Sequence, residues 1–81
     1  MTLAAAVVDE VRKRMLSRNL SQNRLARAAG MPPSLLHRAM NGERPLSIDE
    51  LGAIATVLDV TPEHVVRVAR RAVLATRPPI G

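Results

Sequence analysis

The stretch that most constrains this chain is Ser21 to Gly42, where a glycine and two prolines force a corner between two short apolar segments. Gly30 suits the left-handed conformation of a tight helix exit, which costs other residues about 1–2 kcal/mol. Pro32 and Pro33 suit the first turn of a following helix, because proline fixes φ near its helical value and that turn does not need the missing N–H. We therefore expect two short helices joined at a steep angle.

Both helices have an expected inner side and expected ends. Ser21 can cap the first helix, and Gly42 can end the second in a left-handed conformation. Ala26 is small enough to lie where the two helices cross closely. The residues expected to face inward are Leu25, Ala26, Ala28 and Ala29 in the first helix, Met31 at the corner, and Leu36 and Ala39 in the second.

Positive charge is concentrated around this pair of helices. Between Val11 and Gly42 every charged residue is basic, and acids reappear between Glu43 and Glu63. The basic residues of the first segment are Arg12, Lys13, Arg14, Arg18, Arg24, Arg27 and Arg38. A solvated surface would explain an isolated cluster, but this one is centred on a two-helix corner and favours a polyanionic partner.

These residues resemble the Cro/repressor-type (Xre-like) helix-turn-helix family of small bacterial and phage transcription regulators. The residues that carry the resemblance are Leu25, Ala26, Gly30, Met31, Leu36, Asn41 and Gly42, and the match extends from about Val7 to Val66. The family often has an acid before Asn-Gly that pairs with an arginine on the first helix. Here Met40 and Met15 occupy those positions, and we predict that they touch.

The predicted fold is all-α: a five-helix lambda-repressor-like DNA-binding domain with a helix-turn-helix and an extended C-terminal helix. The first helix is expected over Leu3 to Ser17, with Leu3, Val7, Val8, Val11, Met15 and Leu16 on its apolar stripe. Ser47 and Glu50 form a capping box for a fourth helix that runs to about Leu58. Thr61 caps a fifth helix that reaches Ala75 or Thr76. We assign residues 1–77 to one domain and 78–81 to a flexible C-terminal tail.

Composition excludes several classes of protein. The chain has no cysteine, no aromatic residue and a net charge of +5. No metal site, cofactor or enzyme signature is present, and His37 and His64 have no obvious catalytic partners. No apolar run approaches the roughly 20 residues of a membrane span. We expect a non-enzymatic protein located in the cytoplasm, at the bacterial nucleoid or as a phage protein in its host.

The outer side of the second motif helix is the predicted reading surface for double-stranded DNA. The residues expected nearest the bases are Pro33, Ser34, His37 and Arg38. Arg38 would bind guanine or else a phosphate, Ser34 a base or a phosphate, and His37 a base edge, the backbone or only solvent. By resemblance, Gln22 grips a phosphate. The other backbone candidates are Asn23, Asn41, Arg44, Arg14 and Arg18.

The later half of the fifth helix carries more apolar surface than a small core needs. It either packs on its own chain or forms a homodimer seam through Val68, Ala69, Ala72 and Val73. A dimer would act as a regulator, as a repressor in our interpretation, on a palindromic operator. The alternative is an antitoxin or protein-interaction adaptor of the same fold that acts on a protein partner through its C-terminal helix. RNA is disfavoured, since no aromatic side chain is available for base stacking.

Overall fold

A computed structural model describes residues 1–76 and shows five helices in that range. Their bounds are Leu3–Ser17 for α1, Gln22–Ala28 for α2, Pro33–Met40 for α3, Ile48–Val57 for α4 and Pro62–Ala75 for α5. The predicted all-α, five-helix fold is confirmed, including the start and end of the first helix. Arg77 and the predicted tail, residues 78–81, lie outside the described part of the chain.

Four of the five helices begin with a hydroxyl cap. In each, a serine or threonine oxygen accepts a hydrogen bond from a backbone N–H of the first turn, at 3.0–3.2 Å. The capping residues are Thr2, Ser21, Ser47 and Thr61. The exception is α3, where Pro32 is the N-cap residue and supplies no side-chain hydrogen bond.

The first four helices end in the same way. Each is followed by a residue with positive φ: Asn19 at 54°, Gly30 at 72°, Gly42 at 76° and Asp59 at 58°. The next N–H then bonds to a helix carbonyl five residues back, at 2.9–3.0 Å, which satisfies an otherwise orphaned acceptor. The ends predicted at Asn19, Gly30 and Gly42 are confirmed, and these turns fix the angles between successive helices.

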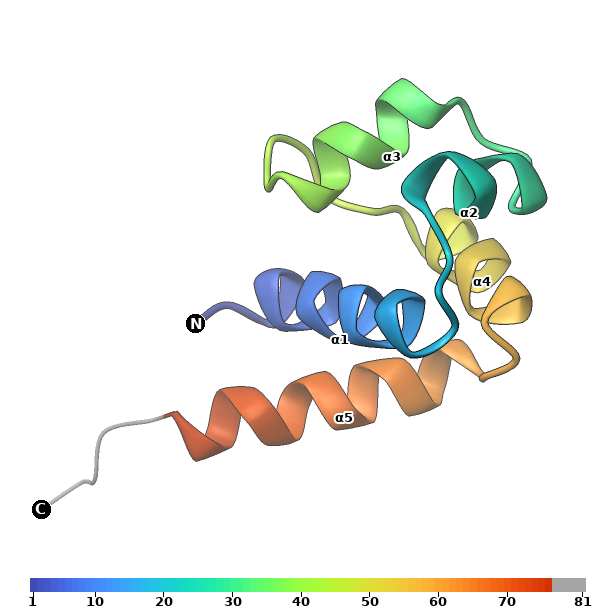
Figure 1. Cartoon of the computed structure of the whole chain (residues 1–81). Coiled ribbons are helices and arrows are strands. Elements are labelled where there is room, and N and C mark those ends of the chain that lie inside the picture. The colour runs from blue at the N-terminus through green and yellow to red at the C-terminus, as the bar shows by residue number, and fades with distance from the viewer. Residues whose placement is uncertain (77–81) are drawn as a thin grey trace, which may run out of the picture.

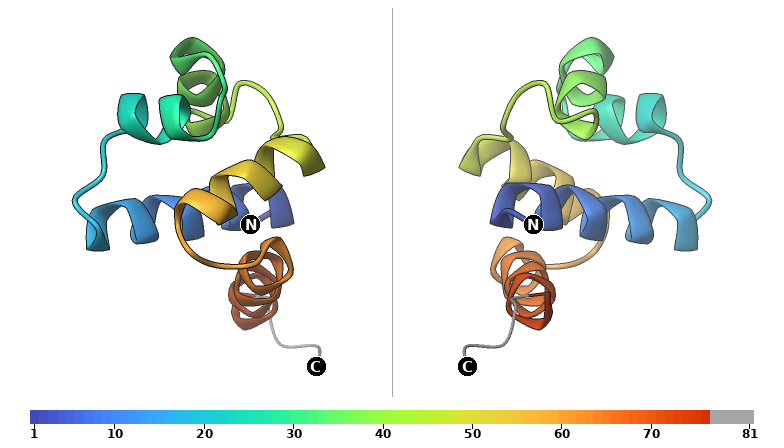
Figure 2. Two further views of the ribbon diagram at one scale, coloured as in Figure 1. Left: turned by 90° about the vertical axis from the view of Figure 1, so that its right-hand side faces the viewer. Right: turned by 90° about the vertical axis from the view of Figure 1, so that its left-hand side faces the viewer.

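The core lies where all five helices meet. Its largest fully buried side chains are Val11, Leu25, Leu36, Ile54, Leu58 and Val65. Figure 1 shows α3 on one side of the molecule and α5 on the opposite side, with α1 between them. Figure 2 confirms that α1 and α5 lie side by side, and it shows α2 beside α3. This arrangement leaves one face of α3 outside the core. Within residues 1–76, no helix is both long enough and apolar enough to cross a membrane.

The structure corrects three residues of the predicted inner surfaces. Leu3 is 43% exposed, because the buried stripe of α1 begins only one turn later, at Ala6 and Val7. Leu16 is 76% exposed, because the buried stripe of α1 follows the four-residue spacing of Val7, Val11 and Met15, and Leu16 lies about 100° away from Met15 around the helix. Ala28 is exposed for the same reason, on the outer side of α2.

The two methionines at the family's ion-pair positions are both buried. Met15 and Met40 belong to one hydrophobic cluster, so apolar side chains occupy the place of a buried ion pair, an exchange that proteins tolerate. A direct contact between the two side chains stays a prediction.

Candidate nucleic-acid interface

The corner between α2 and α3 is built as its sequence indicates. Leu25, Ala26 and Leu36 have no exposed surface, and Met31 is buried beside them. The N–H of Met31 donates to the carbonyl of Ala26 at 2.9 Å, which closes the exit of α2. Because the inner side of α3 is fixed by this packing, the orientation of its outer side is fixed too.

The outer side of α3 carries all four predicted base-contacting residues. Pro33, Ser34, His37 and Arg38 are exposed, and their spacing of three and four places them on one side of the helix. The guanidinium of Arg38 approaches Glu43 at 4.0 Å, and both side chains are 57% exposed. So exposed and distant an ion pair is weak, so Arg38 remains available to an external partner.

The start of α2 lies beside this surface. Gln22 is half-buried at the first position of α2, and its Oε1 lies 3.1 Å from His37 Nδ1. The other ring nitrogen of His37, Nε2, lies 3.2 Å from Asn41 Nδ2. The predicted backbone candidates Gln22 and Asn41 are thus brought together with His37, while Asn23 is exposed next to Gln22.

Two of the three predicted phosphate-binding arginines of the backbone set form close ion pairs within the chain. Arg44 donates through Nη2 to both carboxylate oxygens of Glu50, at 3.0 and 3.2 Å. Arg14 donates to Glu10 at 2.8 Å along α1. In both cases an acid from outside the basic segment neutralises the guanidinium, so a phosphate would have to displace it.

Arg18 is directed away from the reading surface. Its guanidinium approaches Asp59 at 4.0 Å, and Asp59 belongs to the turn between α4 and α5, which Figure 1 places on the side of α1 opposite α3. The sequence did not reveal this, because the pairing joins residues far apart in the chain.

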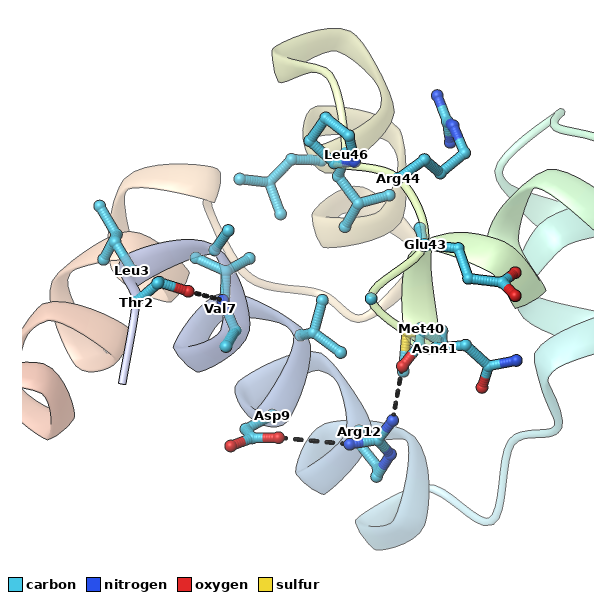
Figure 3. Close-up of a pocket in the computed structure, with 17 residues that line it drawn as sticks. Thr2, Leu3, Val7, Asp9, Arg12, Met40, Asn41, Glu43, Arg44 and Leu46 are labelled. Atoms are coloured by element: carbon cyan, nitrogen blue, oxygen red, sulfur yellow. Dashed lines mark hydrogen bonds and ion pairs between the residues drawn. The ribbon is translucent and has the colours of Figure 1, made fainter.

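Arg12 has a role that sequence reasoning missed. Its Nη1 pairs with Asp9 at 3.2 Å, and its Nη2 donates to the backbone carbonyl of Met40 at 2.9 Å. Figure 3 shows this side chain reaching from α1 to the end of α3. A cation at a helix C-terminus satisfies a free carbonyl and interacts favourably with the helix dipole. Arg12 therefore holds the end of α3 against α1.

Two further cations of the basic segment were given no DNA contact in the sequence analysis. Arg24 and Arg27 are exposed on α2 and form no ion pair within residues 1–76. Their position in the helix that precedes the corner was readable from the sequence, but their lack of acidic partners was not. They add two unpaired positive charges to the helix that precedes α3.

Glu50 carries the one resolved shift in pKa within the described chain. The pKa of Glu50 is lowered from its ordinary value because its carboxylate accepts the N–H of Ser47, and the guanidinium of Arg44 adds to the effect. Glu50 accepts from Ser47 N at 2.8 Å, and Glu50 N donates to the Ser47 hydroxyl at 3.0 Å. The predicted capping box is confirmed, and it rigidifies the segment that follows α3.

The candidate dimer residues differ in how much surface they offer. Ala69 is only 1% exposed within a single chain, so its side chain belongs to the core against α1 and has little area left for a partner. Val68, Ala72 and Val73 are half-buried, and Leu74 is 50% exposed. The apolar surface of α5 that remains open therefore lies in its last two turns.

Comparison with known proteins identifies sequence and structural relatives. The family model described as helix-turn-helix matches residues 11–65. No curated protein sequence matches the chain significantly. Among solved structures, the chain is similar to the clp gene regulator ClgR from Corynebacterium glutamicum, with a TM-score of 0.83, 19% identity and coverage of 93% of this chain and 80% of that one.

A second structural relative is the restriction-modification controller protein C.AhdI from Aeromonas hydrophila. Its TM-score is 0.70 at 27% identity, over 78% of this chain and 94% of that one. Another crystal structure of ClgR gives a TM-score of 0.78 at 19% identity, over 89% of this chain and 94% of that one. These similarities confirm the five-helix arrangement.

Proposed function

The chain belongs to the Cro/repressor-type helix-turn-helix family of DNA-binding transcription regulators, and we propose that it reads a specific DNA sequence by placing α3 in the major groove. The observation that carries this proposal is the outer side of α3. Ser34, His37 and Arg38 are exposed there, and no element of residues 1–76 covers them. A major groove admits one helix whose outward side chains meet the base edges.

Each side chain has a role in this proposal. Arg38 donates bidentately to the N7 and O6 of a guanine, the commonest specific contact of arginine in DNA. Ser34 bonds to a base or phosphate, and Pro33 lies against the base edges at the start of the helix. Gln22 and Asn23 at the start of α2, with Asn41 at the end of α3, bind phosphates on either side of the groove and fix the register.

We propose that the active form is a homodimer on a palindromic site. The half-buried and exposed apolar residues at the end of α5, Val73 and Leu74 among them, would be covered by the same surface of a second copy, as a two-fold interface requires. Two reading helices would then meet half-sites about 34 Å apart, one helical turn of DNA.

Repression is the regulatory outcome that we propose. A dimer that occupies a promoter excludes other proteins from that DNA, so occupancy by itself is sufficient to repress. ClgR is described as a gene regulator and C.AhdI as a controller protein, which supports a regulatory role without fixing its sign. A reporter placed behind the selected site would measure that sign directly.

Selection of bound duplexes from random DNA tests the proposed function. We expect a two-fold symmetric consensus. We also expect affinity to fall about 10³-fold between about 50 and 200 mM salt, as for about six phosphate contacts. Absence of any enriched sequence, or affinity that does not respond to salt, would contradict the proposal.

The exposed apolar surface of α5 supports a second candidate function. In this function the chain is an antitoxin or adaptor that binds a protein through α5. The two functions use opposite sides of the molecule, as Figure 1 shows for α3 and α5. Arg38→Ala should weaken binding to the selected DNA by roughly 5- to 150-fold and leave binding of a protein partner intact. Leu74→Glu should weaken dimerisation or partner binding first. A chain whose cellular activity depends on Leu74 but not on Arg38 would favour the second candidate.

A further inference from the structure

His37 is hydrogen-bonded at both ring nitrogens to side chains of the proposed DNA interface. Its Nδ1 lies 3.1 Å from Gln22 Oε1, and its Nε2 lies 3.2 Å from Asn41 Nδ2. The ring thereby joins the first residue of α2 to the residue that caps the end of α3. All three side chains lie outside the core, so packing does not explain the arrangement.

The chemistry of the two amides assigns the proton of the ring. Asn41 Nδ2 can only donate, so His37 Nε2 must accept. Gln22 Oε1 can only accept, so His37 Nδ1 must carry the proton. One neutral tautomer therefore satisfies both hydrogen bonds, and it also fixes both amides. Gln22 keeps its NH₂ group for DNA, and Asn41 keeps its Oδ1 and one N–H.

We propose that His37 is a positioning residue that sets sequence selectivity by orienting the amides of Gln22 and Asn41, and that protonation of His37 weakens that selectivity. The proposal rests on the DNA-binding function proposed above. It assigns His37 an action through its neighbours, in addition to any contact of its own with DNA.

Protonation of His37 changes which atoms of the Asn41 amide face the DNA. An imidazolium carries N–H groups on both nitrogens, so Nε2 can no longer accept from Asn41. The amide of Asn41 must turn to offer Oδ1 to the ring, and its NH₂ group then faces the DNA in place of the oxygen. Non-specific contact with phosphates gains one positive charge, whereas a base that had donated a hydrogen bond to Asn41 Oδ1 loses its acceptor.

All the charged residues of α2 and α3, the helices that carry the network, are positive. They are Arg24 and Arg27 on α2 and Arg38 on α3, while α1 contacts the end of α3 through Arg12. The first acid after α3 is Glu43, whose carboxylate approaches Arg38. No carboxylate of α2 or α3 is present to hold an imidazolium, so DNA phosphates are the anions that protonation at this position would engage.

Two uncharged substitutions of His37 can each keep one of its two hydrogen bonds and remove the other. His37→Asn places an amide near the position of Nδ1 and can keep the bond to Gln22, whereas His37→Gln reaches the position of Nε2 and can keep the bond to Asn41. Neither side chain titrates. His64→Gln is the matched control, because His64 is exposed in the first turn of α5 and its ring forms no hydrogen bond within residues 1–76.

The free, full-length protein provides the first test, by NMR between about pH 7.5 and 5.5, the range in which histidine ordinarily changes charge. We expect the side-chain amide signals of Gln22 and Asn41 to shift together with the His37 ring. Those shifts should disappear in both His37 variants and persist in His64→Gln. If the amide chemical shifts do not change with pH together with those of the His37 ring, the proposal is wrong, and this test requires no DNA.

The second test compares the selected duplex with an unrelated duplex of equal length over the same range of pH. We expect the affinity ratio of the wild type to fall about fivefold on acidification, the equivalent of one hydrogen bond. The salt slope on the unrelated duplex should steepen by about 0.9, the value of one added phosphate contact. The ratio should not change with pH in either His37 variant.

The outcomes separate this inference from the proposed function. If the wild type prefers the selected duplex but the ratio of its affinities for the selected and unrelated duplexes does not change with pH, the role of His37 is wrong. The proposed DNA-binding function would not be affected. A ratio that still falls with pH in the His37 variants would also overturn it. A protein with no selectivity at any pH would refute the proposed function, and the NMR test would still decide whether the network exists.

Discussion

The starts of α3 and α4 are only 15 residues apart in the sequence. The polar groups at the start of α4 are hydrogen-bonded to one another, whereas those at α3 are largely free. At α4, Ser47 and Glu50 satisfy one another's backbone N–H groups, and Arg44 completes the cluster. At α3, the N-cap residue is Pro32, with no side-chain hydrogen bond, and Arg38 has only a distant acid at 4.0 Å. This difference distinguishes polar groups that stabilise the fold, at α4, from polar groups that are free to bind a partner, at α3.

This comparison makes a general prediction about substitutions. Changes at α4 and its Arg44–Glu50 pair should lower stability without touching DNA reading. Changes on the outer side of α3 should do the reverse. The inner side of α3 supplies the reference, since it belongs to the same helix but to the core.

The largest expected effect is on that inner side. Leu36 has no exposed surface, so Leu36→Ala should lower the free energy of unfolding by about 2–5 kcal/mol through lost burial and a residual cavity. Urea denaturation measures the change, and Leu36→Met is the control that nearly preserves volume, with an expected cost below about 1.5 kcal/mol. A loss no greater than that of the control would show that α3 is not anchored as described.

The next effect is on DNA binding through Arg38. Arg38→Ala should weaken binding to the selected duplex by about 1–3 kcal/mol, or roughly 5- to 150-fold, while the free energy of unfolding stays within about 0.5 kcal/mol. A quantitative gel shift and urea denaturation measure the two quantities. An unchanged affinity for the selected duplex would remove Arg38 from the reading surface.

Arg38→Lys separates the two roles that the sequence left open for Arg38. Lysine keeps the charge but cannot make the bidentate contact to guanine. If Arg38 binds a phosphate, the lysine variant should retain most of the affinity on every duplex. If it binds guanine, affinity should fall on the selected duplex and discrimination should relax at one base position.

A smaller effect is expected at α4, and on stability alone. Glu50→Ala removes one half of the capping box and the partner of Arg44. We expect a loss of about 1–2 kcal/mol in the free energy of unfolding. Affinity for the selected duplex, measured well below the new midpoint of unfolding, should not change. A marked loss of affinity in the folded variant would break the division between the two helix starts.

The smallest effect is the acid dependence of stability contributed by Glu50. Since folding lowers its pKa, its contribution is fully present above the ordinary value of 4.5 and is lost as pH falls through the lower folded-state pKa. Glu50→Gln should therefore flatten the decline in stability below about pH 4.5 relative to the wild type. Parallel curves of unfolding free energy against pH for the two proteins would contradict this assignment.

Much of the fold was readable because its signals are local. Caps, glycine exits and apolar spacing each act within one or two helical turns, and they placed the five helices and the inner residues Leu25 and Leu36 correctly. Leu3, Leu16 and Ala28 were assigned wrongly, because a run of apolar residues does not reveal where the buried stripe begins and ends. Only the neighbouring helices decide that limit.

The candidate site was readable only in part, for the same physical reason. The outer side of α3 follows from helical spacing, so the exposed positions of Ser34, His37 and Arg38 were predicted. The partners of Arg12 and Arg18 lie 28 and 41 residues away, at Met40 and Asp59. The bond between Gln22 and His37 likewise joins two helices. Such tertiary pairings leave no mark on a single sequence.

The most direct test of the central claim, that the outer side of α3 reads DNA, is an NMR titration of the ¹⁵N-labelled protein with the selected duplex. We predict the largest shifts at Gln22, Ser34, His37, Arg38 and Asn41, with α5 changing little apart from any dimer contact. The largest shifts along α5, with α3 unperturbed, would contradict the account.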